Sequence, residues 1–193
     1  LPPISRVQRA MVGEARLMAS LSHANVVGVL DFGESDAEGL YLALEYVEGL
    51  DLEAALMAGG PLEPDLALCI VRSVLHALAY VHGLRSKSGA PLRIVHRDVS
   101  PSNVLLGVNG DVKLGDFGIA RMAQSASKTE PGTFKGKAAY ASPEQVLGLE
   151  LDGRSDLFAV GIVLFELLTG ERPFVAPNRA LLMRDVIEGP RVD

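Results

Sequence analysis

Apolar positions in the first quarter of the chain follow first a helical and then an extended pattern. Residues 8–21 place Met, Ala and Leu at helical spacing among Arg and Glu, which predicts an amphipathic helix. The apolar runs 26–30 and 40–44 predict two strands, and the polar segment 34–39 between them has the length and composition of a hairpin loop. We therefore expect strands in this early part of the chain.

The remainder of the chain predicts mainly helices. The longest runs from Pro64 to a C-cap at Gly83, with apolar residues at intervals of three and four. Two short strands, 104–106 and 112–114, flank Asn109-Gly110, which is the strongest hairpin signal in the chain. Four further helices are expected: residues 51–57 with Asp51 as N-cap and Gly59-Gly60-Pro61 as the stop, a short helix opened by Pro143, the apolar run 157–168 ended by Gly170, and residues 179–187.

Early strands followed by helices predict an α+β fold with two unequal lobes. The small lobe would comprise residues 1–48 and the large lobe residues 49–193, joined near 45–49. Residues 121–138 show neither periodicity, and a stretch of this length without structure in a compact domain is usually functional.

The composition supports a globular domain and excludes several classes of protein. Of 193 residues, 48% are hydrophobic, which excludes intrinsic disorder, and a formal charge of −6 offers no electrostatic footprint for nucleic acid. A single cysteine, Cys69, excludes an intramolecular disulfide and a cysteine-based zinc site, and its apolar helical surroundings predict a buried thiol. No signal peptide is evident, and the longest apolar run, 157–168, is too short to cross a bilayer. We therefore expect a cytoplasmic domain, which regions outside this stretch could anchor to a membrane in the full-length protein.

Two motifs in the middle of the chain carry most of the chemical information. The segment His96-Arg97-Asp98-Val99-Ser100-Pro101-Ser102-Asn103 has the pattern H-R-D-x-x-x-x-N, and Asp116-Phe117-Gly118 follows it after one predicted hairpin. Ser142-Pro143-Glu144 then occupies the place of an A-P-E motif. In this order and spacing the three motifs resemble the eukaryotic-type serine/threonine protein kinase family, most closely its bacterial members, over nearly the whole chain.

The resemblance implies a bilobal protein-kinase fold and transfer of the γ-phosphoryl group of ATP, with Mg²⁺ or Mn²⁺, to a protein hydroxyl. It assigns Asp98 as the acceptor of the substrate hydroxyl proton, Asp116 as a metal ligand and Asn103 as the ligand at the second metal position. Hard carboxylate and amide oxygens suit such ions. Without the shared pattern, Asp98 and Asn103 would be read as loop caps and Asp116 as a turn former at the end of a strand.

Further residues receive roles through the same resemblance. Glu14 matches the helix glutamate that pairs with the phosphate-binding lysine, and a plain surface glutamate is the alternative. The segment 44–49 resembles the hinge between the lobes. By the resemblance, the backbone groups of Glu45 and Val47 would bind adenine, and Leu44 would guard the pocket behind it. Asp51 would meet the ribose or serve only as the helix cap.

Structural roles follow in the same way. Asp156 matches the buried aspartate that holds the backbone of the catalytic loop, and it also suits the first turn of a helix, where the dipole favours an acid. His96 and Phe117 would stack with Met18 and Val29 in a hydrophobic column between the lobes. The other histidines, His82 among them, are expected to be ordinary surface or core residues.

The chain departs from the family pattern at its two ends. The Gly-rich loop and the ATP-anchoring lysine would precede Leu1, and the arginine that pairs with Glu144 would lie beyond Asp193. We therefore expect a fragment, truncated at both ends and lacking the last helices of the large lobe. Alone, it should expose apolar surface, bind ATP weakly and be inactive.

Two substitutions lie inside the motifs. Ser100 stands where serine/threonine kinases usually carry lysine, and Lys137 stands where they usually carry threonine. We hypothesise that Lys137 reaches toward the phosphate or Asp98 in compensation, and the alternative is an exposed Lys137 in a weaker enzyme. Arg97 would dock a phosphorylated residue of the activation loop, with Thr133 at the usual position and Ser125, Ser127 and Thr129 as secondary candidates.

The leading hypothesis is a serine/threonine protein kinase core that acts on a protein substrate. It includes no nucleic-acid partner and no membrane segment in this stretch, and it allows a dimer for autophosphorylation. The alternative is a pseudokinase or scaffold module, although such a protein has no chemical need for Asp98, Asn103 and Asp116 together. A small-molecule kinase of similar fold is a third reading, and the Ser142-Pro143-Glu144 motif favours a protein substrate instead.

Overall fold

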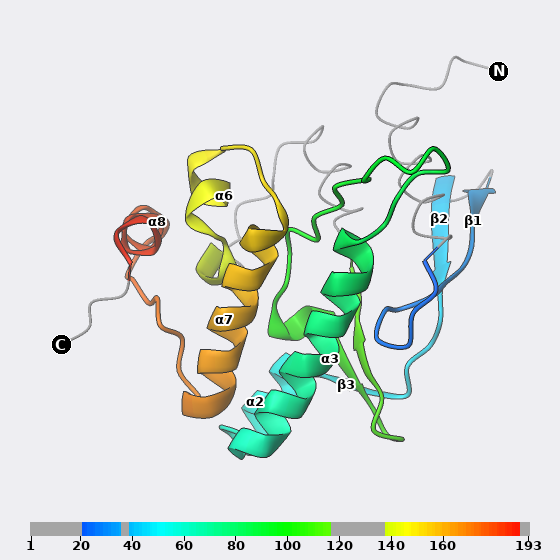
Figure 1. Ribbon diagram of the computed structural model, residues 1–193. Helices are drawn as coiled ribbons and strands as arrows, with labels where there is room; N and C mark the ends of the chain where they lie inside the picture. The colour runs from blue at the N-terminus through cyan, green and yellow to red at the C-terminus, as the bar shows by residue number, and fades with distance from the viewer. Residues whose placement is uncertain (1–20, 36–38, 117–137, 190–193) are drawn as a thin grey trace.

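The computed structural model describes residues 21–35, 39–116 and 138–189 of the chain (Figure 1). A two-stranded hairpin lies at one edge of the molecule, and helices make up most of the remainder (Figure 1). The α+β class predicted from the sequence is confirmed, with a small antiparallel sheet ahead of a mainly helical region.

The hairpin consists of β1 (Val29–Ser35) and β2 (Gly39–Leu44), which pair antiparallel and extend into the predicted loop. The first strand begins later than the pattern predicts, because the residues before it pair elsewhere. Val26 forms a parallel bridge to Leu114, and the amide of Val27 donates to the carbonyl of Leu114 at 3.0 Å. These contacts join the segment before β1 to the larger part of the molecule.

A second sheet contains β3 (Gly49–Asp51), β4 (Val104–Gly107) and β5 (Val112–Leu114), antiparallel and in that order. The turn between β4 and β5 confirms the Asn109-Gly110 prediction. Gly110 has a φ of 87°, and its amide donates to the carbonyl of Gly107 at 2.9 Å. This hairpin places the residues before β4 beside those after β5.

Every helix predicted within the described ranges is present. Asp51 caps α2 (Leu52–Gly59) by accepting from the amide of Ala54 at 2.8 Å, and Gly170 ends α7 (Gly153–Thr169) at a left-handed φ of 74°. At the end of α3 (Pro64–His82), Gly83 is the C-cap but keeps a right-handed φ of −78°. The remaining elements are α6 (Pro143–Leu147), α8 (Arg179–Glu188) and the 3-10 turns η1 (Pro101–Asn103) and η2 (Ala138–Tyr140).

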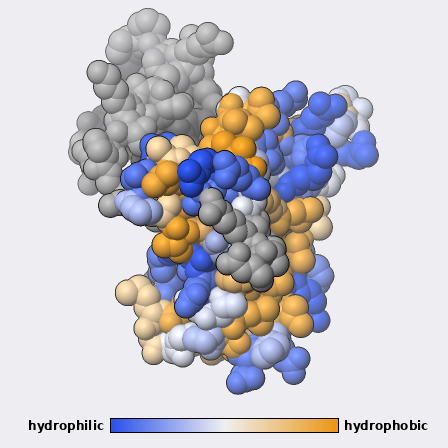
Figure 2. Space-filling model, turned by 90° about the vertical axis from the view of Figure 1, so that its left-hand side faces the viewer, coloured by the Kyte–Doolittle hydropathy of each residue, from blue (hydrophilic) through white to orange (hydrophobic). Residues whose placement is uncertain are grey.

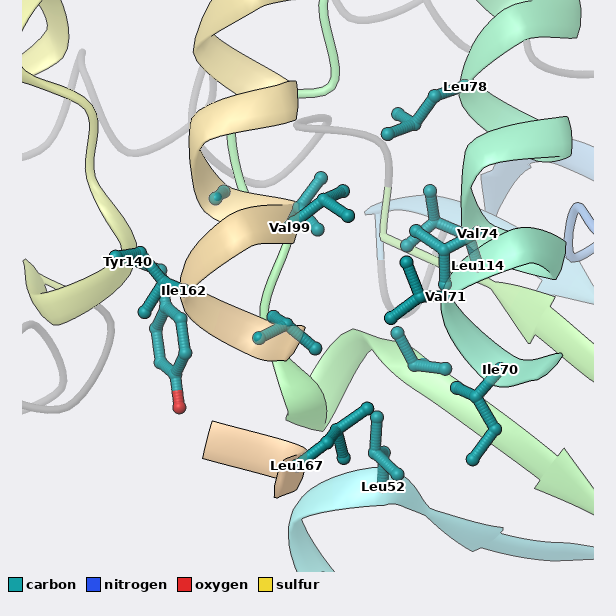
Figure 3. Packing of buried hydrophobic residues seen from close by; sticks show 14 of the residues in the cluster. Leu52, Ile70, Val71, Val74, Leu78, Val99, Leu114, Tyr140, Ile162 and Leu167 are labelled. Atoms are coloured by element: carbon teal, nitrogen blue, oxygen red, sulfur yellow. The ribbon is translucent and has the colours of Figure 1, made fainter. Parts of the chain in front are cut away.

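The core lies where α3, α7 and the β4–β5 hairpin meet (Figure 3). Val74 and Leu78 project from α3 toward Val99 and Leu114, and these four side chains are at most 3% exposed. Burial of each such side chain contributes about 1.5–3 kcal/mol. Because Val99 lies within residues 96–103, the same packing that stabilises the fold also holds this loop in place.

Only one face of α3 is buried. Cys69 is exposed, so the prediction of a buried thiol was wrong, and Leu68 is 54% exposed. The apolar residues of α3 cover more of its circumference than α7 and the sheet can contact. By length and composition, α3 is the one helix in the described ranges that could cross a membrane, although its inner face packs in the core.

Apolar side chains also reach the surface elsewhere. Figure 2, seen from the side that carries α8, shows hydrophobic residues in orange between hydrophilic residues in blue. On α7, Leu157, Phe165 and Leu168 are 49%, 43% and 41% exposed. These three side chains therefore place apolar surface on the outer face of α7.

Candidate active site

The loop of residues 96–103 precedes β4 and ends in η1. Asn103 is 3% exposed, and its amide nitrogen donates to the backbone carbonyl of Asp98 at 2.7 Å and to the Asp98 carboxylate at 3.1 Å. These two donations orient the amide, so its oxygen is the atom suited to a cation. Asp98 and Asn103 therefore form one polar unit.

Asp116 lies beside this unit because of the β4–β5 hairpin. The amide of Gly115 donates to the carbonyl of Asn103 at 2.9 Å, and Asp116 follows directly with an exposed side chain. Asp116 has a φ of 53° and Arg97 a φ of 68°, values that residues other than glycine rarely adopt. Strained backbone of this kind concentrates at functional sites.

His96 connects the two motifs from within the core. It is fully buried, and its Nε2 lies 2.9 Å from the carbonyl of Gly115, while its Nδ1 accepts the amide of Asp98 at 3.3 Å. Burial lowers the pKa of His96 below its ordinary value, although Asp156, Asp98 and Asp116 act in the opposite direction. The imidazole is thus held neutral, with Nε2 as the donor, and bridges the 96–103 loop and the residue before Asp116.

Asp156, in the first turn of α7, reaches the same loop. Its side chain is 1% exposed, and its two oxygens accept the amides of His96 and Arg97, each at 2.8 Å. Asp156 therefore lies in the first turn of a helix and also holds the 96–103 loop through two backbone amides. His82 also contacts this carboxylate, with 2.7 Å between Nε2 and Oδ2, and nothing in the local sequence around His82 indicated it.

The loop is held from α6 as well. Gln145 donates from its side-chain amide to the carbonyl of Arg97 at 2.8 Å. Gln145 is itself fixed by a capping box with Ser142, so the S-x-x-Q spacing was a signal that could have found it. Glu144 accepts a hydrogen bond from the Ser155 hydroxyl, which lowers the pKa of Glu144. Within the described residues, α7 therefore supplies a partner for Glu144.

The hinge segment has a side-chain contact that the sequence analysis missed. The Glu45 carboxylate accepts the amide of Gly28 at 2.7 Å and pairs with Lys113 of β5 at 2.9 Å. Burial raises the pKa of Glu45, but the hydrogen bonds from Lys113 and Gly28 outweigh it, so the pKa lies below its ordinary value. The backbone amide of Glu45 also donates to the carbonyl of Gly28 at 2.9 Å.

Other hinge positions lie near the β4–β5 turn. Val47, Glu48 and Lys113 help to line an open cavity of about 300 Å³. Leu44 is 41% exposed at the end of β2. Asp51 makes the cap contact described above, and that contact uses only its Oδ1.

A largely buried ionic cluster joins η2 to α7 and to the residue Arg172 beyond its end. The Tyr140 hydroxyl donates to the Glu166 carboxylate, and Arg172 pairs with the same carboxylate at 2.9 Å. Burial and Glu166 both raise the pKa of Tyr140, so the phenol stays protonated. Glu166 lies within an otherwise apolar helix, which was a signal that it needs partners.

Several residues named from the sequence lie outside the described ranges, and the structure places none of them. Of the two substituted motif positions, only Ser100 lies within the described ranges. It is 2% exposed, and its hydroxyl lies 3.2 Å from the hydroxyl of Ser102. The residues outside the ranges are Glu14, Met18, Phe117, Gly118, Ser125, Ser127, Thr129, Thr133 and Lys137.

The donors around Asp98 fit a divalent cation bound together with a phosphate chain. Within the described residues, no three His, Cys, Asp or Glu side chains gather into a group that would hold a metal alone. The residues available are instead the Asp98 carboxylate, the oriented Asn103 amide and the exposed Asp116 carboxylate, all hard oxygen donors. An ion that keeps several waters or phosphate oxygens as ligands, as Mg²⁺ does, needs no more from the protein.

Comparison with known proteins agrees with this geometry. The family described as the protein kinase domain matches residues 4–190. The tyrosine-protein kinase MasK of Myxococcus xanthus is 40% identical over 91% of this chain and 28% of its own length. The serine/threonine-protein kinases PrkC of Bacillus subtilis and PknL of Mycobacterium tuberculosis are 42% and 43% identical, over 83% and 86% of this chain. The chain spans 24% of PrkC and 39% of PknL.

Proposed function

This chain belongs to the protein kinase family, and we propose that it forms the catalytic core of a serine/threonine protein kinase. In this proposal, the γ-phosphoryl group of ATP is transferred to hydroxyl groups of protein substrates. The observation that carries it is the Asp98–Asn103 unit with Asp116 beside it, on a loop that Asp156 holds from α7. A module that only binds partners has no chemical need for this arrangement.

Each side chain has a definite task in this proposal. Asp98 orients the acceptor hydroxyl and takes its proton, a role that typically contributes about 10²–10⁴-fold. Asn103 holds the Asp98 carboxylate through its amide nitrogen. Asp116 and the amide oxygen of Asn103 would hold Mg²⁺, or Mn²⁺ in its place, which when bound neutralises phosphate charge. Neutral His96 keeps the loop and Asp116 in register.

The hinge would bind the base of the nucleotide. The carbonyl of Glu45 and the backbone of Val47 are the groups proposed to contact adenine, with Leu44 behind them. The Glu45–Lys113 pair supports this role because it fixes the hinge against β5. Asp51 would meet the ribose through Oδ2, since its Oδ1 caps α2.

Phosphorylation of the long loop is the proposed means of regulation. We expect phosphate on Thr133, added within a transient dimer, to dock on Arg97 through charge-assisted hydrogen bonds. Because ATP is the donor, we place this part of the protein in the cytoplasm. Mass spectrometry of active full-length protein should find Thr133 modified, with Ser125, Ser127 and Thr129 as lesser sites. Active protein in which Thr133 is always unmodified would contradict the assignment.

A transfer assay tests the proposed function. The full-length protein is incubated with Mg²⁺, γ-labelled ATP and myelin basic protein, beside the Asp98→Asn variant and an Asp65→Asn control at the exposed start of α3. We expect Asp98→Asn to lose at least about 10²-fold in rate and Asp65→Asn to match the wild type. Phosphoamino acid analysis should find phosphoserine and phosphothreonine. Full activity in Asp98→Asn would refute the mechanism, and phosphotyrosine alone would refute the acceptor class.

A further inference from the structure

We infer that Gln145 of α6 is a positioning residue for phosphoryl transfer, which sets the orientation of the peptide group that joins Arg97 to Asp98. The catalytic consequence of this inference rests on the proposed function. The side-chain amide of Gln145 donates to the carbonyl of Arg97 at 2.8 Å, across 48 residues of the chain.

The peptide group between Arg97 and Asp98 is held at both of its polar atoms. Its carbonyl oxygen accepts from Gln145, and its amide, which belongs to Asp98, donates to Nδ1 of His96 at the longer distance of 3.3 Å. A peptide group is planar, so holding both atoms fixes the plane. The Cα of Asp98 lies in that plane, and the direction in which the Asp98 side chain leaves the backbone therefore depends on Gln145.

The backbone needs outside support at this point. Arg97 has a φ of 68°, in the left-handed region, which residues other than glycine hold only where the surroundings fix them. Asp156 of α7 accepts the amide of Arg97, and Gln145 of α6 donates to its carbonyl. Two helices thus hold the two backbone groups of one strained residue.

The contact between Gln145 and Arg97 is open to solvent. Water can satisfy the Arg97 carbonyl when the amide is absent, but an exchanging water molecule does not fix the plane of the peptide group. Loss of the Gln145 amide should therefore change the reaction rate more than the stability of the fold.

The identity of residue 145 supports the same role. The amide of Ser142 donates to Oε1 of Gln145 at 3.0 Å, and the amide of Gln145 donates to the Ser142 hydroxyl at 3.3 Å, which completes a capping box. Glutamate serves equally well in such a box, and the helix dipole favours an acid in the first turn. Only an amide can also donate to a carbonyl. The cap alone does not require glutamine, whereas the contact with Arg97 does.

The test compares three variants of the full-length protein: Gln145→Glu, Gln145→Met and the control Leu147→Ala, at a position of the same helix that is 54% exposed. Glutamate keeps the capping box and loses the donor, while methionine loses both and adds no charge. Both Gln145 variants should lose about tenfold in kcat with little change in KM for ATP, since the nucleotide contacts proposed above are untouched. In denaturant unfolding, Gln145→Glu should match the wild type and Gln145→Met should be less stable. Leu147→Ala should keep the wild-type kcat.

A second readout does not depend on activity. The protein is labelled with ¹³C at arginine carbonyls and ¹⁵N at aspartate amides, which selects Arg-Asp pairs. Such pairs occur at 97–98 and 184–185 in this sequence. The carbonyl resonance of Arg97 should move in both Gln145 variants, because it reports the donated hydrogen bond, and that of Arg184 in α8 should stay in place.

The outcomes separate this inference from the proposed function. Wild-type protein that transfers no phosphate would remove the proposed function, while the Arg97 resonance would still decide whether Gln145 orients the peptide group. Wild-type kcat in Gln145→Glu, or an Arg97 resonance that does not move, would overturn the inference. A loss of kcat confined to Gln145→Met would also overturn it, because the capping box would then be the cause. Should Gln145→Met fail to fold, Gln145→Glu and Leu147→Ala carry the comparison.

Discussion

The amide of Asn103 and the imidazole of His96 each have their orientation set by two hydrogen bonds. Neither group can turn over without leaving a buried polar atom unpaired, which costs about 1–3 kcal/mol. At the scale of single residues, therefore, the site is defined by which atom donates and which accepts. Substitutions that keep the shape of a side chain and change its donors test it best.

Lys137 provides a prediction at this scale. If it supplies the positive charge that Ser100 cannot, Lys137→Thr should lower kcat of the full-length protein by at least tenfold. An ion pair at about 4 Å and an effective dielectric of about 20 is worth about 4 kcal/mol, which leaves ample margin for such a loss. Steady-state kinetics would measure it, with Lys137→Arg expected to retain activity. Lys87→Thr, in an exposed loop, is the control; an unchanged kcat in Lys137→Thr would rule out compensation.

Among the elements, the β4–β5 hairpin has the largest effect on the site. It brings Asp116 to Asn103, and it carries Lys113 to the hinge. On its other edge β4 pairs with β3, the strand that follows the hinge. Residues 44–49, the 96–103 loop and Asp116, the proposed metal ligand, are thus parts of one small sheet and its ends.

A prediction at this scale concerns Gly49, where β3 leaves the hinge. A Cβ at Gly49 would lie 1.9 Å from the carbonyl oxygen of Leu106, an impossible distance, so Gly49→Ala must push β3 away from β4. We expect a loss of about 1–3 kcal/mol in the free energy of unfolding, the usual cost of overpacking. Denaturant unfolding would measure it. Gly59→Ala, with nothing near its Cβ, should be neutral or slightly stabilising, and equal effects of the two changes would contradict the model of the sheet.

Most elements could be predicted from the sequence because their signals are local. The Asn109-Gly110 turn, the Asp51 cap and the Gly170 stop each depend on a few neighbouring residues. The late start of β1 could not be predicted, because Val26 and Val27 pair with a strand far along the chain. The local spacing of apolar residues carries no information about which distant segment will form hydrogen bonds with a given stretch of backbone.

The residues of the candidate site also divide into those that the local sequence predicts and those that it does not. The motifs named Asp98 and Asn103, and the structure brings their side chains into contact. The pairs His82–Asp156 and Lys113–Glu45 are separated by 74 and 68 residues, and no short pattern joins them. The error at Cys69 has a related cause, since helical periodicity identifies apolar faces but not which face the rest of the molecule covers.

At the scale of the whole molecule, His96 contributes both to the stability of the fold and to the candidate active site. Because burial lowers its pKa, the unfolded state binds a proton near pH 6.5 that the folded state does not bind. The stabilisation is complete above about pH 6.5 and is lost as the pH falls toward the lower pKa of the folded state, by up to about 1.4 kcal/mol per pH unit.

Denaturant unfolding between about pH 7 and pH 5.5 would test this linkage. His96→Phe should be less stable than the wild type at every pH, because it loses two hydrogen bonds, but its stability should fall less steeply toward acid. His76→Phe, at an exposed position on α3, should keep the wild-type slope. Identical slopes in wild type and His96→Phe would show that His96 is not held neutral.

The central claim is that Asp116 and Asn103 hold a divalent cation that binds with ATP, close to the proton acceptor Asp98. The most direct measurement replaces Mg²⁺ by paramagnetic Mn²⁺ in the isotopically labelled protein, together with a non-hydrolysable ATP analogue. The amide resonances of these three residues should broaden first, those of the distant loop near Lys87 should stay sharp, and Asp116→Asn should require far more Mn²⁺. Broadening that is centred elsewhere, or that is unchanged in Asp116→Asn, would contradict the account.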